Sequence, residues 1–311
     1  HNPYNQNVDF FTCRLYFYIL GKADTIMGCI SEITGQTRLT GLLGSPVSHS
    51  KSPLMHNEAY KLLGLDYVYL CFDVPENNLQ VAFEGLKKLN VAGFNCTMPD
   101  KTLMSKLVDE LSPAAKIIGA VNTVVNDNGK FVGHNTDGTG YIRSLQDCGH
   151  NIVDKKMTLL GSGGAASSIC VQAALDGARE IDVLSIKDNF WSKAEKLVSD
   201  INDNTDCKVN LIEMNDDSIG SSDILTNATP IGMAPNTDGC LVKDSSILRP
   251  ELIVSDIIYN PLETKLYKMA KEKGCSVFNG LYMLLYQGAE AFFLWTGKEM
   301  PTEEIKAKYF D

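Results

Sequence analysis

The sequence predicts an α/β protein with two domains, one of which is built on a doubly wound parallel sheet. The chain has 311 residues, which is long for a single hydrophobic core. Short apolar runs alternate with segments of helical spacing along most of the chain. One apolar run, at 157–160, leads directly into a glycine-rich segment and then a helix, which is the pattern of a nucleotide-binding strand–turn–helix unit.

The first unit alternates strands with helices. Ser50, Ser52 and Pro53 mark the start of its first helix, because serine and proline favour the first turn of a helix. The turn at 126–129 joins two strands as a hairpin. The expected strands lie at 38–43, 66–74, 91–96, 120–126 and 130–133, and the expected helices at 52–63, 79–89 and 101–107.

The pattern of the second unit, in which apolar strands are separated by helices, predicts a Rossmann-like, doubly wound parallel sheet. After Gly280 a long aromatic helix is expected at 282–296, and we expect it to pack back on the first unit. The expected strands lie at 157–160, 180–185, 209–212, 224–227, 252–256 and 276–278, and the expected helices at 167–176, 191–201 and 264–273.

These elements divide the chain into two predicted domains. A substrate-binding, catalytic domain is expected at 27–136 plus 280–311, and a dinucleotide-binding domain at 137–279. Residues 1–26 differ from the rest, with a polar start and an interrupted aromatic stretch. They lack the charged start and the small-residue cleavage site of a signal peptide. We expect them to be a leader or an added extension, with Met27 as the natural start.

Composition excludes several classes of function. The net charge is -10 and the pI is near 5.0, which argues against binding to nucleic acid or to an anionic membrane. No apolar run reaches the roughly 18 residues of a membrane span. The nine cysteines are dispersed without ligand spacing, so we expect neither a metal site nor a disulfide framework. A dispersed, odd set of cysteines predicts a reducing, cytoplasmic location.

Two short polar segments, 93–101 and 133–138, each present one ionisable residue, Lys101 and Asp137. Placed together, a lysine and a carboxylate can act as a proton-transfer pair, because the carboxylate orients the ammonium. An incidental surface ion pair is the simpler interpretation of such residues. The hydroxyls and amides nearby favour the interpretation as a proton-transfer pair, because a polyol ligand needs such groups to bind it. These groups belong to Asn95, Thr97, Asn135 and Thr136.

The glycine-rich segment predicts a site for a pyrophosphate. Glycines permit a tight turn and let backbone N–H groups approach the phosphates at a helix N-terminus. About 20 residues further on, where a ribose-binding residue is expected, the chain has Lys187 and Asp188. Asp188 favours NAD, and Lys187 tolerates the 2′-phosphate of NADP, although both also suit a solvated turn. The pyrophosphate-binding residues are expected to be Gly161, Ser162, Gly163, Gly164 and Ala165.

The residues alone do not decide between a structural and a ligand-binding role for several other polar positions. Ser50 and Ser52 suit a carboxylate site near a helix N-terminus, but a simple helix cap explains them equally well. Asn227 begins a segment suited to a loop over the cofactor or to a plain strand-to-helix connection. Gln287 fits a ligand contact as well as a buried structural role. We expect the histidines at 49 and 56 to be structural.

Together these segments resemble the shikimate dehydrogenase family, particularly its quinate/shikimate branch. The resemblance extends over about residues 37–310. It rests on the order and spacing of segments 50–53, 93–101, 119–123, 133–138, 161–165 and 279–289.

The resemblance implies reversible, NAD(P)-dependent oxidation of shikimate to 3-dehydroshikimate in aromatic amino acid biosynthesis, with quinate as the alternative substrate and a homodimer as an open expectation. Lys101 would be the general acid/base and Asp137 its partner. Ser50 and Ser52 would bind the substrate carboxylate. The remaining implied contacts are Thr97, Asn122, Thr136 and Gln287 to the ring hydroxyls, Tyr69 and Tyr259 near the carboxylate, and Ile257 and Gly280 along the nicotinamide.

The chain departs from the family pattern in three places. Cys96 replaces valine. Ser185 and Ile186 replace an Asn-Arg pair, which removes the arginine that grips a 2′-phosphate and leads us to expect NAD as the preferred cofactor. The stretch from Glu213 to Ser222 is shorter than usual. An enzyme acting on quinate or an aminated analogue, a non-catalytic nucleotide sensor, and a methylene-tetrahydrofolate-dehydrogenase-like enzyme are the competing interpretations.

Overall fold

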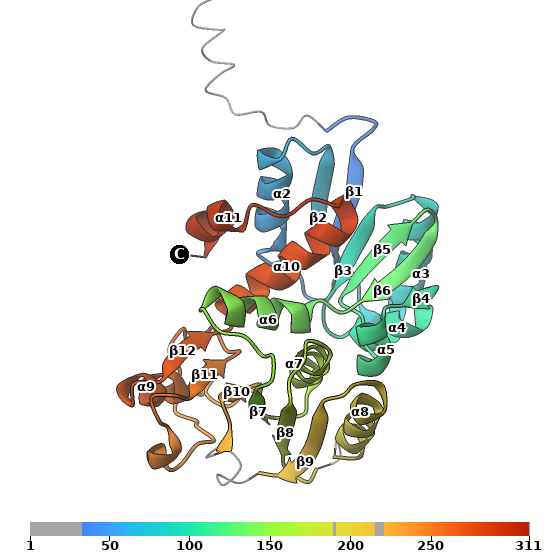
Figure 1. Cartoon of the computed structure of the whole chain (residues 1–311). Coiled ribbons are helices and arrows are strands. Elements are labelled where there is room, and N and C mark those ends of the chain that lie inside the picture. The colour runs from blue at the N-terminus through green and yellow to red at the C-terminus, as the bar shows by residue number, and fades with distance from the viewer. Residues whose placement is uncertain (1–32, 189–190, 215–220, 311) are drawn as a thin grey trace, which may run out of the picture.

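The computed structural model describes residues 33–188, 191–214 and 221–310, and it contains two six-stranded sheets (Figure 1). The predicted leader at 1–26 lies outside the described residues. The predicted fold class is confirmed: the first sheet is mixed and the second is entirely parallel. Within the described part of the chain, no helix is both long and apolar enough to cross a membrane.

The first sheet has the strand order β2-β1-β3-β5-β6-β4. Strands β2, β1 and β3 run parallel to one another, and β5 runs antiparallel to both β3 and β6. The hairpin between β5 and β6 turns at Asn128 and Gly129, whose φ values of 52° and 93° suit the residue types found there. The strands are β1 (Arg38–Gly44), β2 (Tyr67–Asp73), β3 (Gly93–Cys96), β4 (Glu110–Leu111), β5 (Thr123–Asp127) and β6 (Lys130–His134).

Four helices accompany this sheet. An aromatic and aliphatic core that includes Leu43, Phe83, Phe94 and Phe131 joins the strands to α3. The helices are α2 (Ser52–Leu62), α3 (Leu79–Lys88), α4 (Lys101–Leu107) and α5 (Pro113–Ile118).

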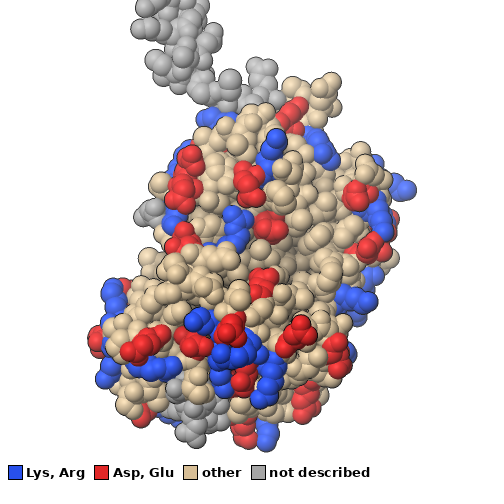
Figure 2. Space-filling model, in the orientation of Figure 1, with Lys and Arg blue, Asp and Glu red and all other residues tan. Residues whose placement is uncertain are grey.

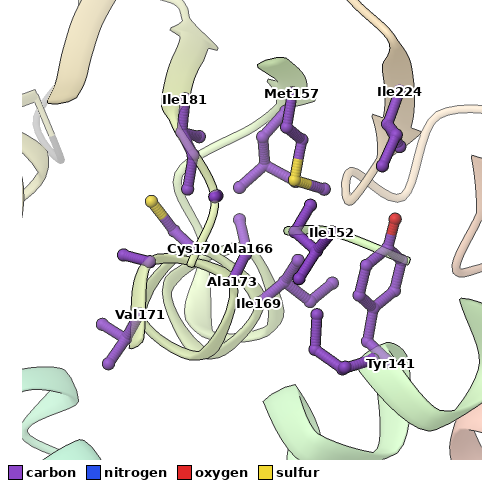
Figure 3. Close-up of a cluster of buried hydrophobic side chains, with 14 of the residues drawn as sticks. Tyr141, Ile152, Met157, Ala166, Ile169, Cys170, Val171, Ala173, Ile181 and Ile224 are labelled. Atoms are coloured by element: carbon purple, nitrogen blue, oxygen red, sulfur yellow. The ribbon is translucent and has the colours of Figure 1, made fainter. Parts of the chain in front are cut away.

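The second sheet has the strand order β12-β11-β10-β7-β8-β9, so the chain reverses direction across the sheet between β7 and β10. Ligands of open parallel sheets bind at the carboxyl ends of the strands beside such a reversal. Its core, in which Ile169 of α7 and Met157 of β7 are buried, is drawn in Figure 3. The elements are β7 (Lys156–Leu160), α7 (Gly164–Leu175), β8 (Glu180–Ser185), α8 (Trp191–Asn204), β9 (Lys208–Glu213), β10 (Ile224–Asn227), β11 (Ile253–Asp256), α9 (Lys265–Glu272) and β12 (Ser276–Asn279).

Two helices, α6 (Asp137–Asp147) and α10 (Leu281–Thr296), lie side by side between the two sheets (Figure 1). Glycine allows them to approach closely, since a Cβ on Gly140 would lie 2.7 Å from the backbone of Gln287 in α10. Tyr141 ties α6 to the second sheet through a 2.6 Å hydrogen bond to Thr226. The other face of α10 packs in the core that contains residues of β1 and α2. The last helix is α11 (Thr302–Tyr309).

Several elements were not predicted from the sequence. These are β4, α5, α6 and α11. In α6 the glycines at 138 and 140 disfavour a helix locally, but they are needed for packing against α7 and α10. Helix α7 begins at Gly164, three residues before the predicted start, because the chain turns into the helix within the glycine segment itself.

Candidate active site

A cavity of about 870 Å³ lies between the two sheets, and its walls come from both. Loops after β1 and β3 form one wall, and the segment after β11 together with the start of α10 forms the other. The structure thus brings together residues that are far apart in the sequence. Ten of the predicted site residues line this cavity: Ser50, Ser52, Thr97, Lys101, Asn122, Asp137, Ile257, Tyr259, Gly280 and Gln287.

Lys101 and Asp137 meet in the cavity wall. Each is the first residue of a helix, and the Lys101 Nζ lies 2.7 Å from the Asp137 Oδ2. Their side chains are 29% and 17% exposed, so the pair is open to a ligand and partly shielded from solvent. Burial raises the pKa of the neighbouring Asp100 carboxyl.

Asn122 fixes the position of Asp137. Its Nδ2 donates to the Asp137 Oδ1 over 2.8 Å, while its Oδ1 accepts from the backbone N–H of Thr136 over 2.8 Å. Both carboxylate oxygens of Asp137 therefore have a donor: the lysine on one and the asparagine on the other. Because a carboxylate with two donors has little freedom to rotate, the ammonium of Lys101 is held in one direction.

Behind this pair lies a chain of buried hydrogen bonds. The Tyr69 hydroxyl donates to the Asn95 Oδ1 over 2.8 Å, and the Asn95 Nδ2 donates to Thr123 over 2.9 Å. Thr123 in turn donates to the Asn122 Oδ1 over 3.0 Å. Tyr69 and Thr136 are buried behind the lining rather than in it. Their predicted contact with the substrate stays a prediction, and the structure shows them instead as supports of the lining residues.

His56 packs against Tyr69, the first residue of this chain of hydrogen bonds. Its ring stacks on that of Tyr69, with centroids 4.4 Å apart and an angle of 9° between the planes. The ring is fully buried, and burial lowers its pKa to about 3, so the imidazole is neutral at pH 7. This placement agrees with the structural role expected for it.

The serine segment serves both as a helix start and as cavity wall. The Ser50 Oγ accepts from the backbone N–H of Ser52, 3.2 Å away, where α2 begins. Lys51 is the N-cap of α2 and no described side chain caps this helix, so the bond between Ser50 and Ser52 closes a turn just before it, and the carboxylate site at these serines stays a prediction. Both hydroxyls line the cavity at the N-terminus of α2, where the helix dipole favours an anion.

The glycine segment after β7 fits a dinucleotide pyrophosphate. Gly161 has φ of +102°, and a Cβ there would lie 2.7 Å from the Thr229 Cγ2, so glycine is required. A Cβ at Gly163 or Gly164 would meet nothing within 4 Å, so the N-terminus of α7 faces open space. Ser162 is held by a 2.8 Å hydrogen bond between its Oγ and that of Ser185. Exposed backbone N–H groups at a helix start are what a pyrophosphate requires.

Lys187 and Asp188 follow β8, the strand beside β7, as predicted. The Lys187 Nζ forms an exposed ion pair with the Glu213 Oε2 at 2.9 Å. Ile186, at the position where the family carries arginine, is 61% exposed. Lys187, predicted to lie near the ribose of the cofactor, is thus already paired with a carboxylate.

Asn227 is the last residue of β10. It is buried, donates to the Asp256 Oδ1 over 3.0 Å, and accepts from the backbone and side chain of Thr229. Its amide therefore shapes the loop after β10. A direct contact between this side chain and the cofactor stays a prediction.

Gly280 is required where α10 begins, because a Cβ there would lie 1.8 Å from the carbonyl oxygen of Ile257. Sequence reasoning missed two residues of α10 that line the cavity, Met283 and Leu284. The signal was available, because residues 280, 283, 284 and 287 recur at the spacing of one helix face. His49 and Lys51 also line the cavity. Among the described residues, no cluster of histidine, cysteine and acidic side chains is arranged to hold a metal ion.

Comparisons with known proteins agree with this geometry. The shikimate dehydrogenase substrate binding domain matches residues 42–124, and the shikimate 5'-dehydrogenase C-terminal domain matches residues 280–308. A shikimate dehydrogenase (NADP(+)) of Listeria monocytogenes serotype 4b is 52% identical over 284 residues, covering 90% of this chain and 98% of the relative.

Solved structures give the same result. The shikimate 5-dehydrogenase of Listeria monocytogenes, in complex with shikimate and NAD, is 51% identical with a TM-score of 0.87, covering 90% of this chain and 98% of that one. The quinate dehydrogenase of Corynebacterium glutamicum, in complex with NAD, is 31% identical with a TM-score of 0.78, covering 87% and 98%. This chain belongs to the shikimate dehydrogenase family.

Proposed function

We propose that this protein is a shikimate dehydrogenase that catalyses the reversible, NAD(P)-dependent oxidation of shikimate to 3-dehydroshikimate in aromatic amino acid biosynthesis. The observation that carries the proposal is the Lys101–Asp137 pair, 2.7 Å apart, in a cavity whose walls come from both sheets. In such a position an alcohol bound on one side can meet a nicotinamide bound on the other.

The polar lining suits a carboxylate-bearing polyol. Ser50 and Ser52 bind the carboxylate at the N-terminus of α2, with Tyr259 beside it. Thr97, Asn122 and Gln287 bind the ring hydroxyls, together with the catalytic pair. Tyr69 and Thr136 hold Asn95 and Asn122 in place from behind.

The chemistry divides between the chain and its cofactor. The nicotinamide, when bound, supplies the hydride acceptor. Lys101, as the uncharged amine, takes the proton of the substrate hydroxyl as the alcohol is oxidised and becomes the ammonium, which returns the proton in the reverse direction. Asp137 orients the ammonium and balances its charge. Ile257, Met283 and Leu284 give this region an apolar wall, which keeps water from the reacting carbon.

The cofactor lies along the second sheet, within the proposed dinucleotide domain at 137–279. Residues 161–165 bind its pyrophosphate, Asp188 accepts from the ribose 2′-hydroxyl, and Ile257 and Gly280 line the nicotinamide. Both NAD and NADP are supported, because one relative is named for NADP(+) and a similar structure holds NAD. Asp188 and the ion pair of Lys187 with Glu213 favour NAD.

We further propose a cytoplasmic location, for which the dispersed cysteines are the support. The substrate domain is proposed at 27–136 plus 280–311, and a homodimer remains an expectation from the family.

Quinate is the second candidate substrate, favoured by the similarity to a quinate dehydrogenase. The test is formation of reduced nicotinamide by the purified protein with shikimate or quinate, each with NAD and with NADP. We expect strong turnover of shikimate. Turnover of quinate at a comparable rate would place the enzyme in the dual-specificity branch, and no turnover in all four combinations would contradict the proposed function.

A further inference from the structure

The proposed substrate is an anion, whereas the protein carries a net charge of -10. Acidic and basic side chains are interspersed on the face shown in Figure 2. The long-range field of the molecule therefore does not favour approach of a carboxylate. A local cation near the carboxylate site is needed, because serine hydroxyls and a helix N-terminus supply only partial charges.

Among the charged residues that line the cavity, one is a candidate for this local cation. The lysine, arginine and acidic residues among the described lining residues are Lys51, Lys101 and Asp137. Lys101 and Asp137 form an ion pair with each other, so their charges cancel at a distance. Lys51 remains as the cation without a compensating carboxylate in the wall.

Lys51 lies between the two serines of the proposed carboxylate site. Its Nζ lies 3.4 Å from the carbonyl oxygen of Tyr309, the last residue of α11, and 5.5 Å from the centre of the Phe310 ring. No carboxylate of the described residues forms an ion pair with it. The nearby Glu58 of α2 is engaged by Lys308 at 2.8 Å.

Among the described residues, the ammonium thus has a long hydrogen bond to a neutral carbonyl at the C-terminus of a helix and the ring of Phe310 beside it, but no carboxylate. A carboxylate is a stronger partner for an ammonium than a carbonyl. The lysine side chain is long and flexible, so its charge can turn from the carbonyl to an incoming anion without movement of the backbone.

We propose that Lys51 attracts the substrate carboxylate and guides it to Ser50 and Ser52, and that it makes the enzyme selective for an anionic over a neutral polyol. The inference rests on the proposed function and names the residue that selects its substrate by charge. Lys51 acts before and during binding, and takes no part in the transfer of the proton or the hydride.

The test compares Lys51→Gln with the wild type on shikimate and on its uncharged methyl ester, used as a substrate or as an inhibitor of shikimate turnover. The ionic strength is varied from about 0.02 to 0.3 M, a range over which screening of exposed charges changes strongly. Lys51→Arg keeps the charge. Lys61→Gln, on the last turn of the same helix and away from the lining, is the matched control.

We expect Lys51→Gln to lower kcat/KM for shikimate by about three- to tenfold at low ionic strength, through KM, and to flatten its dependence on salt. The ester should be bound equally by the wild type and by Lys51→Gln. Lys51→Arg and Lys61→Gln should resemble the wild type.

An unchanged KM and salt dependence in Lys51→Gln, or an equal loss for the acid and the ester, would overturn the inference while leaving the proposed function intact. Failure of the wild type itself to turn over shikimate would overturn both.

Discussion

Replacing Asn122 by alanine tests whether the position of Asp137 matters for turnover. In the wild type the Asn122 amide donates to Asp137 and accepts from the backbone of Thr136, each over 2.8 Å. In Asn122→Ala the Asp137 Oδ1 loses its donor, and the buried N–H of Thr136 loses its acceptor. Asp137 then keeps only Lys101 as a fixed partner and can rotate with it.

The size of the effect follows from these two groups. A buried polar group left without a partner costs about 1–3 kcal/mol, so for two such groups the free energy of unfolding should fall by about 2–6 kcal/mol. A displacement of about 1 Å in a catalytic group can cost about 100-fold in rate, so kcat should fall by about 10- to 100-fold. The KM for the cofactor should change little, because Asn122 lies on the substrate side of the cavity.

The assay is steady-state kinetics together with urea unfolding of the same preparations. Asn126→Ala is the matched control, because Asn126 lies in the same strand region, donates to the Val91 carbonyl and the Asn90 side chain, and accepts from the Gly129 backbone. This control should lose a smaller free energy of unfolding, because two of its three hydrogen bonds are exposed, and should keep its kcat. A folded Asn122→Ala enzyme with a kcat like that of the wild type would refute the positioning argument.

The remaining predictions concern three separate parts of the molecule. In Gly280→Ala the new Cβ would collide with the Ile257 carbonyl, so we expect the KM for the cofactor to rise by about tenfold or more and the stability to fall by about 1–3 kcal/mol. Burial lowers the pKa of His56 to about 3, so below the unfolded value of about 6.5 only the unfolded chain binds the proton. Stability is therefore full above about pH 6.5 and falls by about 1.4 kcal/mol per pH unit as the pH drops toward 3, and His56→Phe should lose this part of the slope in urea unfolding. Asp188→Ala should raise the KM for NAD more than that for NADP, because it removes the acceptor for the ribose hydroxyl and a repulsion against the 2′-phosphate.

Each of these has an outcome that would contradict it. Gly85→Ala, where a Cβ meets nothing within 4 Å in the middle of α3, should be neutral or slightly stabilising, and a similar loss there would remove the steric argument for Gly280. An unchanged pH slope in His56→Phe would show that another group titrates in that range. Equal changes in KM for both cofactors would exclude Asp188 as the ribose-binding residue.

Sequence patterns predicted the strands of both sheets well, apart from the two-residue β4, because their apolar runs are short and bounded by turn residues. They also predicted that Lys101 and Asp137 belong together, which the 2.7 Å contact confirms. The helix that begins at Asp137 was missed. Its glycines disfavour a helix locally, and the reason for them lies in α7 and α10, which no local pattern reports.

Burial was the other feature that local patterns could not supply. Tyr69 and Thr136 have polar groups suited to a ligand, yet their partners are other buried side chains. Asn227 likewise uses its amide to bind Asp256 of β11 and Thr229 of its own loop. Whether a polar side chain faces a cavity or supports its wall depends on contacts between distant segments, and these become visible only in the fold.

The most direct test of the central claim is turnover of shikimate by Lys101→Ala, with Lys106→Ala on the same helix as the control. If Lys101 transfers the proton, the variant should fold normally and bind shikimate, while its kcat falls by about 10²- to 10⁴-fold and the control stays at the wild-type rate. A Lys101→Ala enzyme that keeps its kcat within about threefold of the wild type would contradict the assignment of the Lys101–Asp137 pair as the catalytic centre.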